Sequence, residues 1–218
     1  MKKHSLFKVL ASGLLLTMTS VSCVGAKTDF NEVGKQMLIM LRNSHYERFD
    51  FDAKLGERFF DTYIKELDGN KQYFLAGDIA KFRAKYGKNM HKLLLEGKSM
   101  EAATEIHALY RLRANARIKY AQELLKNEAQ FTFDTHRTMM RSRKDAQWPT
   151  TEDEAKQVWR DIVEQALLSE VLRRETITEM AKKQGKEDPQ NNKNSPGKKI
   201  SLRFERILHG INESNPEE

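Results

Sequence analysis

The sequence predicts an all-α protein, because apolar residues recur at helical spacing while strand patterns are scarce. One clear helical face places apolar side chains four, four, one and three residues apart, at Leu55, Phe59, Tyr63, Ile64 and Leu67. Alternating runs of Val, Ile and Thr are few, whereas Ala, Leu, Lys, Arg, Glu and Met dominate. With 218 residues, 39% of them hydrophobic, the chain is long enough for one helical domain with a core or two small ones, but not for a large multidomain enzyme.

Residues 1–26 are typical of an export signal rather than of the fold. Three early lysines precede an apolar run, 9–21, that is too short to span a bilayer comfortably. The small residues 24–26 form a cleavage site, which would leave Lys27 as the mature N-terminus. The alternative is a bacterial lipoprotein with Cys23 as the lipidated residue. Either reading predicts a protein of the periplasm or cell envelope of a bacterium, without a transmembrane helix in the mature chain.

Charge and chemistry-bearing residues exclude several classes of function. The net charge is +7, and removing the three lysines of residues 1–26 leaves 7 − 3 = +4, with acids and bases interspersed. A nucleic-acid partner is therefore not expected for an exported protein. The single cysteine cannot form an internal disulfide. The six histidines form no i, i+4 pair and have no cysteine partner, so we expect neither a metal site nor a cofactor.

Helix signals divide the first half of the chain. We expect helices at 30–45, at 54–67, at 78–86 with Asp78 as N-cap, at 90–96 with a C-terminal glycine, and from a capping Ser99 to about residue 125. Asp68-Gly69-Asn70 is a turn signal. The apolar run 73–75 after it is either a core-facing anchor or a docking surface. The long helix also carries a basic face, either solvated or facing an anionic surface, formed by Arg111, Arg113, Arg117 and Lys119.

The second half is less regular. We expect a helix break at 131–133, a polar helical piece at 135–144 and a boundary at Trp148-Pro149. A capping box at 151–154 should open a helix that continues towards Met180. A flexible linker at 184–199 and an amphipathic helix at 200–211 should follow, before an acidic tail. The predicted division is therefore a signal at 1–26, a helical domain at 27–183, the linker, and a terminal helix with its tail at 200–218.

Short collinear motifs resemble the N-terminal helical domain of the tail-specific (C-terminal processing) proteases. They are His45-Tyr46, Phe60-Asp61-x-Tyr63-x-x-x-Leu67-Asp68, Tyr73-Phe74-Leu75-x-x-Asp78-Ile79, Gly97, Ile106, Tyr110, Arg113, Leu124-Leu125, Trp148, Trp159-Arg160 and Leu202-x-Phe204-Glu205-Arg206-x-Leu208. The likeness covers most of residues 36–210. It departs from the family at Gly69, where the turn usually has proline, and this exchange loosens the turn.

The resemblance implies a non-catalytic domain. In that family a Ser nucleophile and a Lys base lie on a separate catalytic domain, downstream of a PDZ domain. No segment here resembles the PDZ domain or the catalytic domain. Ser142 and Ser195 lack a placed base, so no catalytic residue can be carried over and the chain is not expected to be an enzyme by itself. We expect either a standalone N-terminal domain or the product of an interrupted gene whose full form would be a serine endopeptidase.

Two functions remain open. The first is an interaction module that packs beside protease and PDZ domains, or binds an envelope adaptor, and so arranges substrate access. The second is a freestanding envelope binding protein, lipid-anchored at Cys23 or not. The structural and interaction residues that we single out are Tyr46, Phe60, Tyr63, Leu67, Asp68, Tyr73, Phe74, Asp78, Trp148 and Trp159. The last helix distinguishes the two functions. If its apolar stripe is buried within this chain, the domain is complete; if the stripe is exposed, a missing partner is implied.

Overall fold

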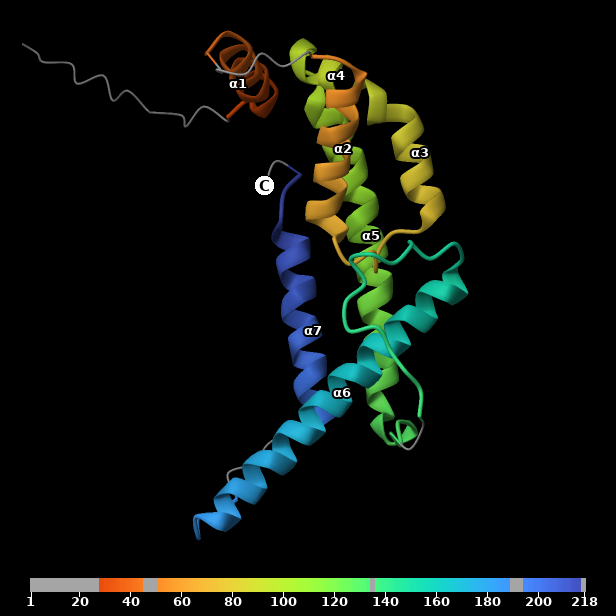
Figure 1. The fold of residues 1–218 in the computed structure, drawn as a ribbon, viewed down its shortest axis with the longest axis vertical. Coiled ribbons are helices and arrows are strands. Elements are labelled where there is room, and N and C mark those ends of the chain that lie inside the picture. Colours follow the sequence, from red (N-terminus) through yellow and green to blue (C-terminus); the bar gives the residue numbers. More distant parts are fainter. Residues whose placement is uncertain (1–27, 45–50, 134–135, 189–193, 217–218) are drawn as a thin grey trace, which may run out of the picture.

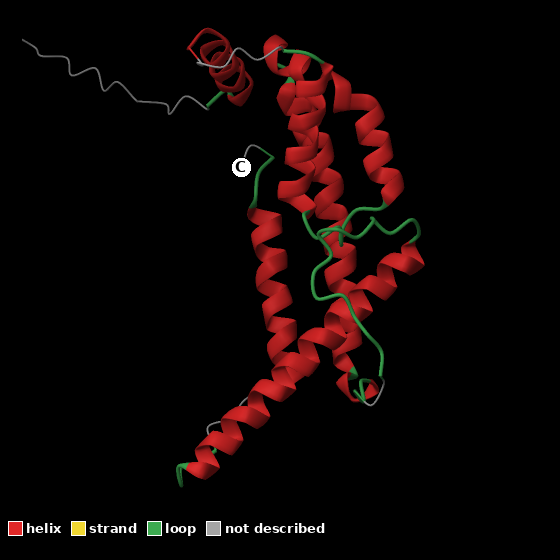
Figure 2. Cartoon of the chain, in the orientation of Figure 1, coloured by secondary structure: helices red, strands yellow, loops and turns green. Residues whose placement is uncertain are grey.

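The computed structural model describes residues 28–44, 51–133, 136–188 and 194–216. These residues form helices joined by loops, without a strand among them, which confirms the all-α prediction (Figure 2). The elements in chain order are α1 (Phe30–Ser44), α2 (Ala53–Asp68), α3 (Ala76–Tyr86), the 3-10 turn η1 (Gly87–Asn89), α4 (Met90–Glu96), α5 (Ser99–Lys126), the 3-10 turn η2 (Glu128–Gln130), α6 (Glu152–Lys183) and α7 (Pro196–Glu213).

The long helix α5 is the central helix of the molecule (Figure 1). Its N-terminal half contacts α1 and α4, and α2 packs on α4 and η1 at the same end. α6 and α7 both contact α5 further along, and they also contact each other. The C-terminal part of α6 projects beyond this bundle, and α7 returns alongside α5 towards the end where α1 lies (Figure 1).

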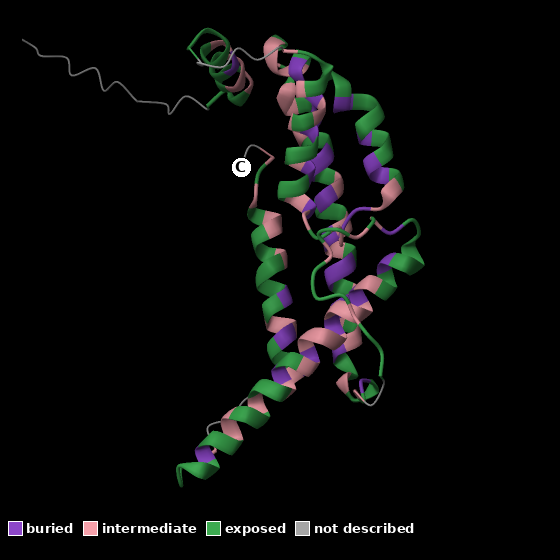
Figure 3. Ribbon diagram, viewed as in Figure 1, coloured by how far each residue is buried: buried purple, intermediate pink, exposed green. Residues whose placement is uncertain are grey.

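One continuous hydrophobic core joins the helices from α2 to α7, and its buried residues form a stripe along α5 (Figure 3). Phe60 of α2 and Phe74 of the following loop are fully buried, and Trp159 of α6 is 2% exposed. α7 belongs to the same core, because Ile200 and Phe204 are buried and Leu208 packs against the cluster, while Ile207 is 37% exposed. Most of the stripe predicted for the last helix is therefore covered within the chain.

Several predicted helix boundaries hold. Gly97 ends α4 in the left-handed conformation at φ 67°, where a residue without Cβ avoids strain. Thr151 is the N-cap of α6, and its hydroxyl accepts a hydrogen bond from the Glu154 backbone N–H at 3.1 Å. The carboxylate of Glu154 accepts hydrogen bonds from the backbone N–H and the hydroxyl of Thr150. In a regular capping box it would accept from the backbone of the N-cap residue itself, one position later.

The predicted helical piece at 135–144 is wrong. Residues 136–144 are loop, and the described chain continues without a helix through residue 151, up to the start of α6 (Figure 2). This segment has four basic residues and lacks an apolar stripe to bury, so a short helix there would gain no packing energy. It is held to α6 instead by Arg137, which pairs with Asp161 at 3.1 Å and with Glu164 at 2.5 Å.

Three other boundaries also differ from expectation. α3 begins at Ala76, so Asp78 is not its N-cap but lies inside the first turn. Ser99 is the first residue of α5, and its side chain does not cap the helix. α7 begins at Pro196, capped by the Ser195 hydroxyl at 3.2 Å from the Lys198 backbone nitrogen, so the end of the predicted linker is helical.

Candidate functional site

The turn after α2 is organised by the carboxylate of Asp68, which is 2% exposed. Its Oδ1 accepts a hydrogen bond from the Gln72 backbone N–H at 2.8 Å, and its Oδ2 accepts from those of Tyr73 and Phe74, both at 3.1 Å. The carboxylate thus accepts hydrogen bonds from backbone N–H groups of the turn, for which the turn's own backbone offers no acceptor. Gly69 sits in the right-handed region, and the positive φ of this turn, 51°, falls on Lys71 instead.

Two tryptophans from distant segments close the same turn. The indole Nε1–H of Trp148, in the loop before α6, donates to Asp68 Oδ2 at 3.1 Å. That of Trp159, on α6, donates to the Gln72 carbonyl at 2.8 Å. Burial raises the pKa of the Asp68 carboxyl, and the hydrogen bonds that it accepts from the turn's backbone and from Trp148 act in the opposite direction by stabilising its charged form. The turn therefore connects α2 to α6 through polar contacts.

A chain of aromatic rings adds an apolar connection beside the polar one. The Tyr73 ring lies edge-on to Tyr110 of α5, with centroids 5.3 Å apart, and tilted to Trp159 at 5.6 Å. Trp159 in turn meets Phe204 of α7 at 5.8 Å. Tyr73 and Phe74 are both buried, so their run is a core-facing anchor and not a docking surface. Burial also raises the pKa of Tyr73 to about 12.

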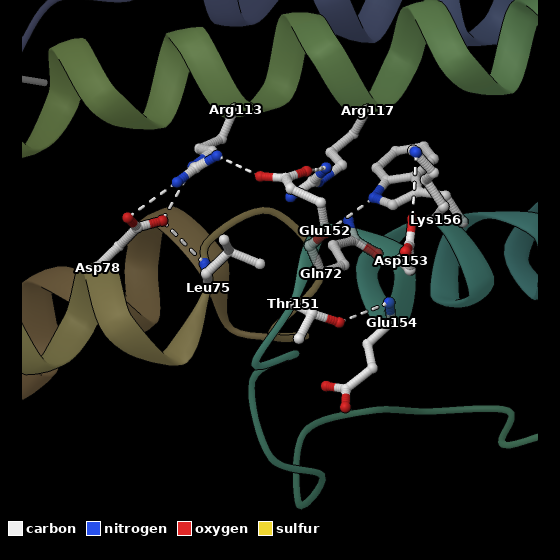
Figure 4. Close-up of polar contacts among 11 residues, drawn as sticks. Gln72, Leu75, Asp78, Arg113, Arg117, Thr151, Glu152, Asp153, Glu154 and Lys156 are labelled. Atoms are coloured by element: carbon white, nitrogen blue, oxygen red, sulfur yellow. Dashed lines mark hydrogen bonds and ion pairs between the residues drawn. The ribbon is translucent and has the colours of Figure 1, made fainter.

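A second polar cluster lies between α3, α5 and α6 (Figure 4). Asp78 accepts from the Leu75 backbone N–H at 3.0 Å and forms a two-pronged pair with Arg113, at 2.9 and 3.0 Å. Arg113 also binds Glu152 at 2.5 Å, and the other oxygen of Glu152 binds Arg117. The Arg117 guanidinium is the main cause of the lowered pKa of the Glu152 carboxyl.

This cluster corrects both readings of the basic face of α5, because two of its four residues neither face solvent nor are free to meet an anionic surface. Arg117 is 4% exposed, and Arg113 is held between two carboxylates, while Arg111 and Lys119 do face solvent. The i, i+4 spacing of the two inward arginines was visible in the sequence. Their acidic partners were not, because Asp78 and Glu152 lie on other elements and come close only in the fold.

The remaining residues singled out from the sequence also lie in or beside the core. Phe60 is fully buried, with the Arg83 guanidinium 5.1 Å from its ring centroid. The Tyr63 hydroxyl donates to the Ala103 carbonyl at 3.3 Å, and Leu67 packs against the core. Tyr46 and Cys23 lie outside the described residues.

The two clusters are suited to joining helices rather than to transforming a substrate. Their carboxylates are occupied by internal donors, and the aromatic groups beside them are buried. Within the described ranges, groups of three or more His, Cys, Asp or Glu placed to hold a metal ion are not found. The same part of the chain contains no helix that is both long and apolar enough to cross a bilayer.

Exposed apolar surface gathers at α1. Only Leu38 of this helix is buried, and Met37 and Met40 are 59% and 62% exposed. Under α1 lies a mostly apolar hollow of about 310 Å³, between this helix and α2, α4 and α5. Its lining includes Tyr63, Met90 and Met37. This end of the molecule therefore presents an exposed apolar surface of the kind that is typical of a contact with another polypeptide.

Comparison with known proteins identifies relatives of this sequence. The family model described as the tail specific protease N-terminal domain matches residues 37–215, which includes the predicted linker and α7. A protein of Haemophilus influenzae named "Tail-specific protease" is 34% identical over 125 residues. That match covers 57% of this chain and 18% of the relative, so the chain corresponds to a small part of that protein's length.

Proposed function

The chain belongs to the tail-specific protease N-terminal domain family, and we propose that it serves as a non-catalytic helical module in proteolysis within the bacterial envelope. In this role it packs against protease and PDZ domains or binds an adaptor, and so arranges the access of substrates. The observation that carries the proposal is the family match across residues 37–215, which reaches over every helix from α2 to α7.

The geometry supports a positioning role. The carboxylates of Asp68 and Asp78 are consumed by contacts that fix α2, α3, α5 and the loop before α6 relative to one another. Such a rigid body can present a surface at a defined place, which a scaffold domain requires. The surface that we assign to the protease or adaptor is the exposed face of α1, carrying Val33, Met37 and Met40.

A first experiment establishes what the chain works with. An antibody raised against the purified chain is used to probe fractionated source cells, followed by chemical cross-linking and mass spectrometry of the captured species. We expect the antigen in the envelope fraction, either cross-linked to a protease with PDZ and catalytic domains or continuous with one in a larger band. An antigen in the cytoplasm, or one with neither a protease nor an adaptor in its cross-links, would contradict the proposal.

A matched pair of variants tests the assigned surface. Met37→Glu with Met40→Glu places two charges on the α1 face, and both side chains are already more than half exposed, so the fold should be retained. Leu172→Glu with Met180→Glu makes the same change on the projecting part of α6, where these residues are 53% and 57% exposed. We expect the α1 pair to abolish the cross-links and the α6 pair to preserve them. The reverse pattern would assign the contact to α6.

A further inference from the structure

A groove between α6 and α7 combines an apolar floor with a cationic rim. The hollow measures about 510 Å³ and is lined by residues of both helices. Figure 1 shows α6 and α7 crossing, and the two helices contact each other. Ile162 and Ala166 of α6 and the buried Phe204 of α7 line it, so a side chain entering it would meet hydrocarbon. The polar part of the lining is mainly basic: Arg173, Lys199, Arg203 and Arg206.

One carboxylate is already bound in this groove. Glu170, whose side chain is 9% exposed, accepts hydrogen bonds from Arg173 at 2.7 and 2.9 Å and from Lys199 at 2.9 and 3.0 Å. Arg174 adds a third cation at 2.8 Å. Three positive groups around one negative group leave an excess of two positive charges, and they hold the pKa of Glu170 well below its usual range, Arg173 being the largest cause. This part of the groove is therefore lined by cations that already pair with one internal carboxylate.

The cationic row continues along α7 beyond this internal carboxylate. Lys199, Arg203 and Arg206 follow one another at spacings of four and three, so they share one stripe of the helix. Arg203 and Arg206 are exposed and have no ion-pair or hydrogen-bond partner among the described residues. The acid next to them on α7, Glu205, does not line the groove. Two further positive charges thus face the hollow without an internal counter-charge.

We propose that the α6–α7 groove is a docking site for an acidic amphipathic segment of another polypeptide, which places apolar side chains on the floor and carboxylates against Arg203 and Arg206. Charge complementarity selects this occupant, because an uncharged apolar segment would leave the basic rim without a partner and a basic one would be repelled. An acidic helix with carboxylates three or four residues apart would match the spacing of the cations. This inference does not depend on the α1 surface proposed above.

The test is fluorescence anisotropy with the whole chain and a labelled synthetic peptide in which Glu and Leu alternate at helical spacing. A matched peptide with Gln in place of Glu and a second with Ser in place of Leu separate the two contributions. We expect saturable binding of the first peptide, weakened by salt, and at least about tenfold weaker binding of either control, because charge contacts and apolar burial both contribute.

Two variants and a control locate the site. Arg203→Glu with Arg206→Glu reverses two exposed charges, and Ser169→Trp fills the groove from an exposed position, so neither change touches the core. Each should weaken binding at least about tenfold. Arg111→Glu with Lys119→Glu makes the same charge change on the solvated face of α5 and should leave the affinity within about twofold. Thermal melts followed by circular dichroism verify that each variant is folded.

Four outcomes would overturn the proposal. Equal weakening by the Arg111 and Lys119 pair would show non-specific attraction to positive charge. Undiminished binding to the Ser169→Trp variant would place the peptide elsewhere. Equal or stronger binding to vesicles of anionic lipid, with loss of both on Arg203 and Arg206 reversal, would make the groove a membrane contact instead. Failure of the peptide to bind at all would also reject it, whatever the α1 experiments show.

Discussion

Replacing Asp68 with alanine removes the carboxylate that organises the turn between α2 and α3. Two of its donors, the backbone N–H groups of Tyr73 and Phe74, are buried and would lose the hydrogen bonds that they make to this carboxylate. The other two, from Gln72 and Trp148, are partly exposed and can rebind water. The substitution therefore leaves two buried donors unsatisfied while the surrounding core remains packed.

The expected cost follows from these two groups. A buried donor without a partner costs about 1–3 kcal/mol, so the pair amounts to about 2–6 kcal/mol. Removal of a buried charge offsets part of this cost, since burial raises the pKa of the Asp68 carboxyl and so disfavours its ionised form. We expect the free energy of unfolding to fall by about 3 kcal/mol. Asp68→Asn should lose less, because an amide oxygen can still accept from the buried donors.

Urea unfolding monitored by tryptophan fluorescence and by far-UV circular dichroism measures this effect. Trp148 and Trp159 both bond to the turn, so the fluorescence reports on it directly. Asp61→Ala is the matched control on the same helix, because its carboxylate is 55% exposed and pairs with Arg83, which is 45% exposed. It should cost at most about 1 kcal/mol. If Asp68→Ala and Asp61→Ala lose the same free energy, the role assigned to Asp68 is refuted.

Three further changes have definite expected results. Gly56→Ala would place Cβ 2.7 Å from His91 Nδ1 and 3.1 Å from two backbone carbonyl oxygens, so overpacking of about 1–3 kcal/mol should outweigh alanine's helix propensity and lower the melting temperature. Glu170→Gln should destabilise the protein at pH 7. Because Arg173 lowers the pKa of this carboxyl from its ordinary 4.5, the loss should shrink as the pH falls below that value in urea unfolding. Thr151→Ala should cost about 1 kcal/mol of unfolding free energy by uncapping α6.

Each of these has its own control. Gly34→Ala in α1 meets its nearest atom, Leu94 Cδ2, at an ordinary 3.5 Å, so it should not lower the melting temperature. A gap between wild type and Glu170→Gln that stays constant with pH would contradict the role of the ionised carboxylate. Thr151→Ser keeps the capping hydroxyl and should retain most of the stability that Thr151→Ala loses.

Local chemistry predicted much of the helix pattern correctly. The apolar spacing along α2, the glycine after α4 and the hydroxyl that opens α6 act within a few residues of one another, so a single sequence contains the information. The helix predicted at 135–144 is not formed over residues 136–144, for the converse reason. Its residues tolerate a helix, but without an apolar face to bury, the ion pairs of Arg137 with α6 decide its path.

The polar clusters required contacts that no local pattern contains. Asp78 was expected as an N-cap, but α3 starts earlier and the carboxylate also binds Arg113 of α5. Arg117 was expected in solvent or at an anionic surface, yet it is buried beside Glu152, which is 35 residues away. Helix periodicity places a side chain on a face, but only the packing of other elements determines whether that face meets water or a carboxylate.

By itself the sequence determined the all-α class, the positions of most helices and the family, because these depend on residue spacing and short collinear motifs. Only the tertiary structure decided that α7 packs into the main core, that Asp68 joins two tryptophans to one turn, and that α6 and α7 enclose a basic groove. Burial and electrostatic pairing arise between residues far apart in the chain, and their energies exist only once the helices are packed together.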